Sequence, residues 1–508
     1  MNLLYITLDS LNRHFLPCYG NDWVQTPNID RLAAKGVVFD HHYAGSLPCM
    51  PARREMWTGT EEFWWRWWGP LEPWDRTLAY TLGRGGFTSQ LITDHYHYFE
   101  WGAHSFEYDF DGYTAVRGHE HDNHRTRPFG EAPDWARVLL TRRPTDAPIY
   151  VRNVQDYWGE EDFFSPRVFA ATARWLRGER PPEPWYLHVD AFDPHEPFHV
   201  PEPYRSMYTD DDYRRYSPWP LYGRVDRGAS ALSPEEVAWV RAQYAGKITM
   251  ADRWLGRVLD TLDERGLWDD TIVVLTTDHG HYLGDHGWMG KPQCPIYDTL
   301  AHIPLLMWWP GCASGTRCDA LTQTIDLFPT VLDMLGQPLP DWPQVHGRSF
   351  APVLRGEHAT SYAPPQRDYT ISGYYGGRVA VRSEGWTLLR AHDPSRAPLF
   401  EYTHDLQVRD RSWACRRRDP EAFVVPDLEA GRFIPGLNMP VWRIPEERRW
   451  GEHADMLFGP DDPAQEHNVA HDHPEQVRRL EEILRQRMRE RHVPSELYAR
   501  LRVDGDGA

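Results

Sequence analysis

Short apolar runs alternate with longer stretches of helical periodicity along most of the chain. An apolar, β-rich run from Asn2 to Leu8 ends in Asp9-Ser10, which predicts a buried strand almost from the first residue. Further strands are predicted at Thr88–Thr93, Trp185–Ala191, Thr271–Thr277 and Ile303–Trp308. Helices are predicted at Ile29–Lys35, Ala52–Trp57, Phe164–Arg177, Pro234–Arg265, Leu327–Leu335 and Pro474–Arg491. Strands that alternate with helices favour a largely parallel sheet with helices on both faces.

The pattern changes after the proline-rich stretches Pro338–Pro343 and Pro364-Pro365. Three short antiparallel strands are predicted beyond them, at Tyr369–Ser372, Arg378–Ser383 and Trp386–Arg390, before the last helix. The fold class is therefore α/β, with a large mixed, mostly parallel sheet sandwiched by helices and a smaller C-terminal α+β subdomain. We expect the larger domain at residues 1–360 and the C-terminal subdomain, with a short antiparallel sheet and a terminal helix, at residues 361–508.

Two segments show little regular pattern, Asp111–Phe163, which is rich in His and Arg, and Asp410–Trp450. Long irregular segments in a compact protein are often functional loops.

Composition excludes several classes of partner. The 55 Lys and Arg residues against 74 Asp and Glu residues give a formal net charge of -19, which argues against binding to nucleic acid or to an anionic membrane surface. No stretch approaches the roughly 20 apolar residues that span a bilayer, and Leu3–Leu8 is too short for a signal peptide. The six cysteines form no CxxC pair. We therefore expect a cytoplasmic protein with reduced thiols.

Polar residues follow two of the predicted strands. Asp9 ends the first strand, and Asp278-His279 ends the strand that begins at Thr271. In parallel sheets, ligands bind beyond the carboxyl ends of the strands. Carboxylate oxygens with one imidazole suit calcium, magnesium or manganese. An aspartate after a strand is more often a turn residue, so each position alone is weak evidence for a metal.

The strongest local pattern is Leu47-Pro48-Cys49-Met50-Pro51-Ala52-Arg53. A cysteine at a helix N-terminus feels the positive end of the helix dipole, which lowers its pKa and favours a bound anion. Arg53, one turn later, could pair with Cys49 or with that ligand. A buried, inert cysteine at a helix start is the alternative interpretation, and without further context it is the more common one.

The pattern Cys-x-Pro-x-Arg resembles the signature of the sulfatase family, in the alkaline phosphatase superfamily. The resemblance extends from Asn2 to about Ala470, in separate blocks. It implies that Cys49 is oxidised to formylglycine, whose hydrated aldehyde is the nucleophile, and that Arg53 orients it. It also implies that Asp9, Cys49, Asp278 and His279 hold one divalent metal ion, with calcium or manganese favoured over magnesium. Ser10 stands where most members have a second aspartate. In this respect the chain is nearest to phosphonate monoester hydrolases and choline-sulfatase-like members.

The resemblance assigns further residues to the reacting group. His195, in Asp193-Pro194-His195-Glu196-Pro197, matches the family histidine that contacts the leaving oxygen or the sulfuryl group. Lys291, in the stretch that follows the metal aspartate, matches a lysine that contacts the transferred group. His95 and His97 lie where many sulfatases have a Lys/His pair, and a structural role for these two is equally expected.

The expected function is metal-dependent hydrolysis of a sulfuric ester, with a sugar, aryl or choline-type sulfate as substrate and a formylglycine-generating enzyme as maturation partner. The alternative is a phosphonate monoester hydrolase or phosphodiesterase that uses the same residues. A third hypothesis is a catalytically silent homologue, against which the intact cysteine motif argues. The cluster Phe63-Trp64-Trp65-Arg66-Trp67-Trp68 suits a hydrophobic core or a homo-oligomer interface better than it suits a ligand site.

Overall fold

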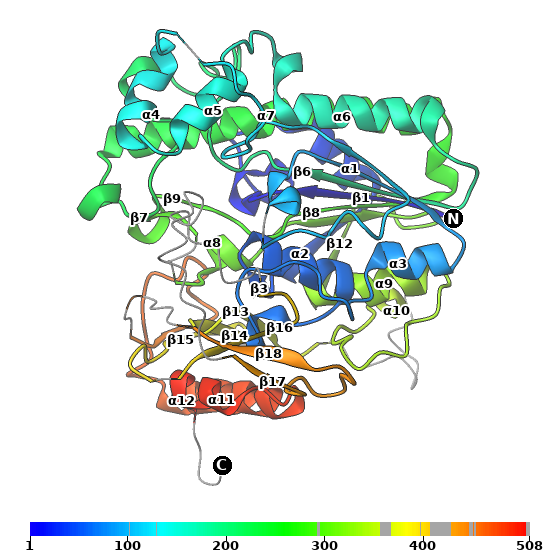
Figure 1. Cartoon of the computed structure of the whole chain (residues 1–508), viewed down its shortest axis with the longest axis vertical. Helices are drawn as coiled ribbons and strands as arrows, with labels where there is room; N and C mark the ends of the chain where they lie inside the picture. Colours follow the sequence, from blue (N-terminus) through cyan, green and yellow to red (C-terminus); the bar gives the residue numbers. More distant parts are fainter. Residues whose placement is uncertain are drawn as a thin grey trace.

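The structure, a computed structural model, describes residues 1–503 except 101, 129, 292–294, 356–366, 397, 407–427, 447–450 and 452–453. Its largest sheet has eight strands in the order β12-β2-β11-β8-β1-β6-β4-β5 (Figure 1). The strands are β1 (Asn2–Leu8), β2 (Val37–Tyr43), β4 (Thr88–Thr93), β5 (Gly112–Ala115), β6 (Trp185–Ala191), β8 (Thr271–Thr276), β11 (Leu305–Trp308) and β12 (Thr316–Gln323). Only β11 runs antiparallel to its neighbours β2 and β8. The predicted mixed, mostly parallel sheet is confirmed.

Helices cover both faces of this sheet (Figure 1). Leu4, Ile6 and Leu8 of β1 pack with one set of helices: α1 (Pro27–Lys35), α6 (Phe164–Arg174) and α7 (Pro234–Glu264). Leu3 and Tyr5 point to the other face, against a second set: α2 (Cys49–Thr58), α3 (Leu78–Arg84) and α9 (Leu327–Met334). Successive side chains of a strand point to opposite faces, so β1 contributes to both cores.

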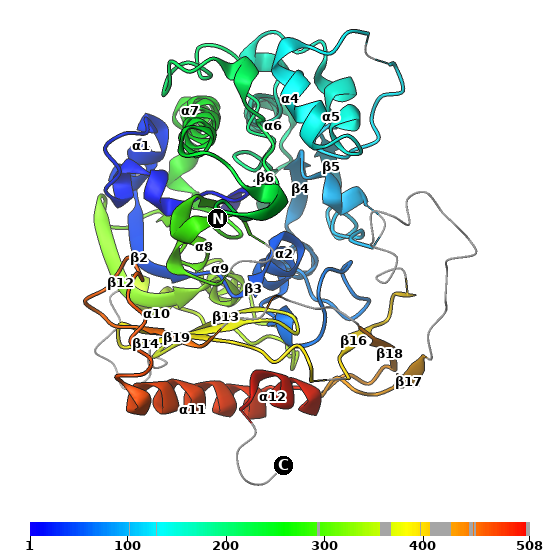
Figure 2. The same ribbon diagram turned by 90° about the vertical axis from the view of Figure 1, so that its left-hand side faces the viewer.

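A second sheet lies between α2 and the C-terminal helices (Figure 2). Its order is β19-β15-β14-β13-β3, with β3 (Ser46–Leu47), β13 (Thr370–Tyr374), β14 (Val379–Ser383), β15 (Trp386–Arg390) and β19 (Met456–Phe458). Strand β3 directly precedes α2 and pairs with β13, so this sheet fixes the start of α2. The C-terminal helices are α11 (Pro474–Glu490) and α12 (Ser495–Leu501). The division at residue 360 stays a prediction.

Smaller elements complete the described fold. Two three-stranded sheets contain β7 (Gly223–Arg224), β9 (Tyr282–Leu283) and β10 (Trp288–Gly290), and β16 (Phe400–Thr403), β17 (Glu429–Gly431) and β18 (Val441–Pro445). The remaining helices are α4 (Arg137–Arg142), α5 (Ala147–Val154), α8 (Asp298–Ala301) and α10 (Ala351–Leu354). The expectation of little regular structure in Asp111–Phe163 was wrong, because β5, α4 and α5 lie there. It was also wrong for the described part of Asp410–Trp450, which contains β17 and β18, and residues 410–427 and 447–450 lie outside the described residues. In the described part of the chain, no helix is long and apolar enough to cross a membrane.

Candidate active site

Three carboxylates meet at the carboxyl ends of adjacent central strands. Asp9 directly follows β1, and its backbone N–H donates to the carbonyl of Ala191 (2.9 Å). Asp278 follows β8, which pairs with β1 on one side. Asp190 is the last residue but one of β6, which pairs with β1 on the other side. The parallel arrangement therefore brings all three side chains to one edge of the sheet.

The helix α2 places Cys49 and Arg53 beside these carboxylates. Arg53 donates to both carboxylate oxygens of Asp190 (2.9 Å each) and to Oδ2 of Asp278 (2.6 Å), and it pairs with Oδ2 of Asp9 (2.9 Å). It also donates to the carbonyl of Cys49 (3.3 Å). All four charged side chains are fully buried. Arg53 thus ties the start of α2 to the strand ends, and a single guanidinium cannot balance three carboxylates.

The predicted ligand set fits a divalent cation. Asp9, Cys49, Asp278 and His279 are buried, and one ligand atom from each lies within 4.8 Å of the others. Nδ1 of His279 bonds to the carbonyl of Gly280 (2.8 Å), which leaves Nε2 beside Sγ of Cys49 (3.3 Å). A histidine that holds a metal ion commonly makes such a bond with its other nitrogen. The surplus of negative charge around Arg53 also favours a bound cation at this position.

Ser10, which replaces the usual second aspartate, ties two of these carboxylates together. Its hydroxyl donates to Oδ1 of Asp9 (2.6 Å), and its backbone N–H donates to Oδ1 of Asp278 (3.0 Å). Its φ of 62° lies in the left-handed region, which few residues other than glycine adopt. Ser10 therefore occupies a strained position in which its backbone and its side chain both serve the site.

The thiol of Cys49 is a weak nucleophile in this environment. Burial raises its pKa well above the usual range, and the carboxylate of Asp9 raises it further. The expectation of a lowered pKa was wrong, because burial and the carboxylates of Asp9 and Asp278 outweigh the opposing charges of Lys291 and Arg53. Burial alone would also raise the pKa of Asp9, but Lys291 and Arg53 hold it well below its usual value. Asp9 is therefore ionised at neutral pH.

The structure brings Lys291 and His95 to the same carboxylates. Lys291 directly follows β10, and its Nζ donates to Oγ of Ser10 (2.8 Å) and lies 3.6 Å from Oδ1 of Asp9. Nε2 of His95 lies 3.4 Å from Oδ2 of Asp9. Burial and the charge of Arg53 hold the pKa of His95 well below its usual value, so this imidazole is neutral.

His97 lies at the margin of the site. Its Nδ1 contacts Oε2 of Glu100 (2.5 Å), and its ring and that of Trp68 form a T-shaped pair (4.8 Å between centroids). The remaining tryptophans of the predicted cluster are core residues, since Trp64, Trp65 and Trp67 are all buried in the hydrophobic cluster around the C-terminal sheet. The core interpretation of this cluster is confirmed for these three.

His195 is fixed by its own loop and by the long helix α7. Its Nδ1 bonds to the carbonyl of Glu196 (2.8 Å), and its ring stacks on Phe192 (4.2 Å). The buried ammonium of Lys247, on α7, donates to the carbonyls of His195 and Pro197 and pairs with Asp193 (2.8 Å). Lys291 and Asp9 are near enough for their charges to affect the pKa of His195. His195 therefore belongs to the same electrostatic site.

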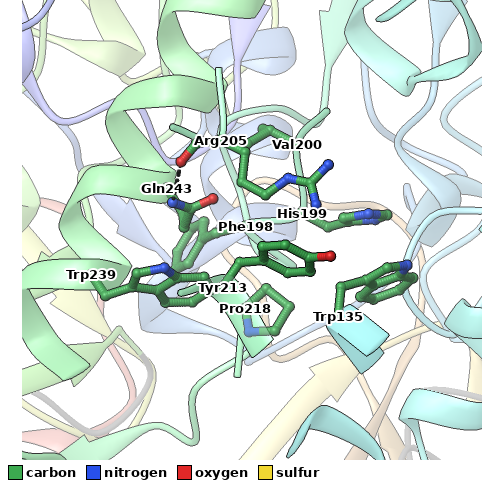
Figure 3. A pocket seen from close by; sticks show the side chains of 9 residues that line it. All are labelled: Trp135, Phe198, His199, Val200, Arg205, Tyr213, Pro218, Trp239 and Gln243. Carbon is green, nitrogen blue, oxygen red and sulfur yellow. Dashed lines mark hydrogen bonds between the residues drawn. The ribbon is translucent and has the colours of Figure 1, made fainter. Parts of the chain in front are cut away.

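The segment after His195 continues into a small, mostly aromatic pocket (Figure 3). Its lining residues are Trp135, Phe198, His199, Val200, Arg205, Tyr213, Pro218, Trp239 and Gln243. Trp135 stacks on His199 (3.8 Å), and Nε2 of Gln243 donates to the carbonyl of Arg205 (2.9 Å). No predicted site residue lines it. Gln243 is one helical turn from Lys247, so α7 anchors this segment at two successive turns.

Sequence reasoning missed several residues that complete the site. Asp190 had a signal that was not used, because it is an acidic residue inside the otherwise apolar run Trp185–Ala191. Tyr98, whose hydroxyl donates to Asp190, and Glu120, which faces His195, had no local signal. Their contacts exist only in the folded chain. Cys49, Cys18, Cys312 and Cys318 are free thiols, and the other two cysteines lie outside the described residues.

Comparisons with known proteins agree with this geometry. The family model described as Sulfatase matches residues 1–337. The chain is 29% identical over 413 residues to the multifunctional alkaline phosphatase superfamily protein PehA of Trinickia caryophylli. The aligned region covers 70% of this chain and 77% of that protein. It is 26% identical over 427 residues to a choline-sulfatase of Rhizobium meliloti, with 80% of each chain covered.

The fold agrees with that of a solved relative. The phosphonate monoester hydrolase of Agrobacterium radiobacter superposes with a TM-score of 0.65 at 22% identity, over 96% of each chain. Because the family model covers more than half of the 508 residues, and its signature cysteine lies among the carboxylates, the chain belongs to the sulfatase family of the alkaline phosphatase superfamily.

Proposed function

We propose that this protein hydrolyses sulfuric esters of small molecules, with a formylglycine derived from Cys49 as its nucleophile and one divalent metal ion as its cofactor. The observation that carries the proposal is the position of Cys49, buried at the N-terminus of α2 with Sγ 3.3 Å from Nε2 of His279 and beside Asp9 and Asp278. A buried thiol with a raised pKa is poorly suited to attack an ester. Oxidation to an aldehyde, whose hydrate supplies the attacking hydroxyl, gives this position a nucleophile.

The surrounding residues have separate roles in the proposal. Asp9, Asp278, His279 and residue 49 hold the metal ion, which supplies Lewis-acid stabilisation of the charge on the transferred group. Calcium or manganese suits this oxygen-rich set with one imidazole, and magnesium also fits. Arg53 fixes the start of α2 relative to the three carboxylates through its hydrogen bonds to them.

Two further side chains act on the ester itself. The ammonium of Lys291 stabilises negative charge on the non-bridging oxygens, and His195 acts at the leaving oxygen. His95, neutral and beside Asp9, fits a hydrogen-bond partner of the transferred group. His97 supports it from the margin of the site.

A second candidate function uses the same residues on phosphonate monoesters or phosphodiesters. Ser10 supports it through the resemblance alone, because phosphonate monoester hydrolases resemble this chain in having a single aspartate at the end of the first strand. The name of PehA as a multifunctional protein supports a broad specificity, and the name of the choline-sulfatase supports a sulfate ester. Sugar, aryl and choline-type sulfates are the substrates to test first.

The test begins with the tryptic peptide Gly36–Arg53, from protein made together with a formylglycine-generating enzyme. An aldehyde or its hydrate at position 49 is the expected mass. The matured protein is then assayed for release of sulfate and phosphate from matched aryl esters, with Cys49→Ser as the control. Release of sulfate that depends on both maturation and metal supports the proposal, and faster release of the phosphorus product favours the second candidate. An intact thiol, or equal turnover by Cys49→Ser, contradicts the proposed nucleophile.

A further inference from the structure

The Nδ1 atom of His195 is surrounded by acceptors. It bonds to the carbonyl of Glu196 (2.8 Å), and it also lies 3.3 Å from Oε2 of Glu196 and 3.2 Å from Oε1 of Glu120. All three side chains are buried. An imidazole nitrogen among three oxygens is a donor, so Nδ1 carries a proton. Its other nitrogen, Nε2, is therefore the one available to a substrate.

Glu120 comes from a distant part of the sequence, the histidine-rich segment between β5 and α4. Its φ is 40°, in the left-handed region that a residue with a Cβ seldom adopts. The hydroxyl of Tyr96 donates to its Oε2 (3.1 Å), and Nδ1 of His121 lies 3.7 Å from the same oxygen. Backbone strain of this kind persists where the surroundings enforce it, and it is common at functional sites. Here it aims a buried carboxylate at an active-site histidine.

The same three side chains form a group that could in principle hold a metal ion. The geometry argues against that use. A metal ligand must offer a lone pair, and Nδ1 of His195 already donates to a backbone carbonyl. Of the two oxygens of Glu196, Oε1 accepts a hydrogen bond from the hydroxyl of Tyr222, and Oε2 faces Nδ1 of His195 (3.3 Å). A proton on Nδ1 satisfies these contacts with no ion.

We propose that Glu120 is a positioning residue for ester hydrolysis, which together with Glu196 holds His195 as an imidazolium with Nε2–H directed at the leaving oxygen. The inference rests on the proposed function. As the bond between sulfur or phosphorus and the leaving oxygen breaks, its electron pair stays on that oxygen, which takes the proton from Nε2. The imidazole becomes neutral and keeps its Nδ1 proton, which continues to donate to the acceptors around it. Water restores the lost proton.

The charges around His195 support this state. Burial alone would lower the pKa of His195, but Glu196 and Glu120 raise it above the usual value against the opposing effect of Lys291. The charged and titratable groups that face His195 are Glu120, Glu196, Asp9, Lys291, Lys247 and His281. Glu196 has the largest effect of these charges, and Glu120 and Asp9 add to it, so that together they outweigh burial and the ammonium of Lys291.

The first test compares Glu120→Gln with Asp146→Asn as a matched control. Asp146 directly precedes α5, outside that segment, and contacts His121 (3.4 Å) rather than His195. We expect Glu120→Gln to lower kcat by about ten- to a hundredfold for a phenyl ester, within the range for general acid catalysis. We expect less than about a threefold loss for a 4-nitrophenyl ester, whose leaving group needs no proton. The basic limb of the pH–rate profile should move to lower pH, and Asp146→Asn should match the unaltered protein. Equal losses on both esters, with an unmoved basic limb, would overturn the proposal.

The second test does not need turnover. The matured, metal-loaded protein is labelled with ¹³C-histidine, and the His195 resonance is identified as the one missing in His195→Gln. This resonance is then titrated in the unaltered protein and in each variant. We expect the pKa of His195 to fall in Glu120→Gln, and to fall in Glu196→Gln as well, but not in Asp146→Asn. An unchanged His195 titration in Glu120→Gln overturns the inference, even if ester hydrolysis is confirmed. A changed titration in a protein that cleaves no ester refutes the proposed function and retains the role of Glu120 in holding His195.

Discussion

The buried pair of Lys247 and Asp193 determines how firmly the His195 loop is held. Nζ of Lys247 lies 2.8 Å from Oδ1 of Asp193 and donates to the carbonyls of His195 and Pro197. Both side chains are almost fully buried, with exposed fractions of 2% and 1%. Lys247→Met keeps the length of the side chain and removes its charge and its three hydrogen-bonding protons.

The magnitude follows from burial and distance. Two unit charges about 3 Å apart attract by roughly 6 kcal/mol at an effective dielectric constant of about 20. Removing one partner of a buried pair costs about 3–5 kcal/mol, because the other charge stays buried and unpaired. Here that charge is Asp193, which would keep a hydrogen bond from the hydroxyl of Ser165 (2.5 Å) and lies 3.6 Å from Nε2 of His119. The cost therefore lies toward the lower end of this range. We expect Lys247→Met to lower the free energy of local opening by about 3 kcal/mol or more.

Hydrogen exchange of the His195 amide measures this effect, since that N–H donates to the carbonyl of Phe192 (2.9 Å). A loss of about 3 kcal/mol corresponds to roughly hundredfold faster exchange. The double variant Lys247→Met/Asp193→Asn should recover a large part of the loss, with a coupling energy of about 1–3 kcal/mol. Lys35→Met, which removes a lysine that stacks on Trp268 (4.6 Å), is the matched control. Unchanged exchange in Lys247→Met, or strictly additive losses in the double variant, would refute this reasoning.

Three further predictions follow from the described contacts. Burial raises the pKa of Glu55 to about 7. As pH rises, Glu55 therefore ionises first in the unfolded chain, and the free energy of unfolding should fall by up to about 3 kcal/mol between about pH 4.5 and pH 7. Melting curves at several pH values measure this dependence, which Glu55→Gln should flatten. Asp278→Asn should lower both the bound metal, measured by elemental analysis, and kcat, and unchanged metal occupancy would remove Asp278 from the ligand set. Trp64→Ala should lower the free energy of unfolding by about 3–5 kcal/mol with little change in KM, because Trp64 is buried in the hydrophobic core. A large rise in KM in a variant that remains stable would instead indicate that Trp64 contacts the substrate.

The sequence predicts best the central strands of the large sheet. Strands β1 and β6 are buried at every residue and are mostly apolar, and they have the predicted limits; β4 has them too, although its first three residues are polar. Strand β2 was missed, since its sequence VVFDHHY carries an acidic and two imidazole side chains. The helix α2 begins three residues before the predicted Ala52, at Cys49 itself. Its start is set by the pairing of β3 with β13, which no local pattern encodes.

Some residues of the candidate site could likewise be predicted from the sequence, and others could not. Asp9 and Asp278 could be predicted because they follow strands that were themselves predictable. Glu120 could not, because its only relation to His195 is a contact between residues 75 positions apart in the sequence. Resemblance to the sulfatase family identifies the residues that its members share. Residues that tune those groups in this chain, such as Glu120 and Lys247, emerge only from the three-dimensional contacts.

The distribution of charge explains how a chain with a formal charge of -19 can bind the proposed anionic ester. The carboxylates of Asp9, Asp190 and Asp278 are not left facing the substrate, because Arg53 and the proposed divalent ion neutralise them from within. Lys291 then adds positive charge where the sulfuryl or phosphoryl group would lie. The remaining acidic residues near the site act through a histidine, since Glu120 and Glu196 face Nδ1 of His195. The positive charge that the transferred group would meet is therefore local, from Lys291 and the proposed ion, although the protein as a whole is strongly acidic.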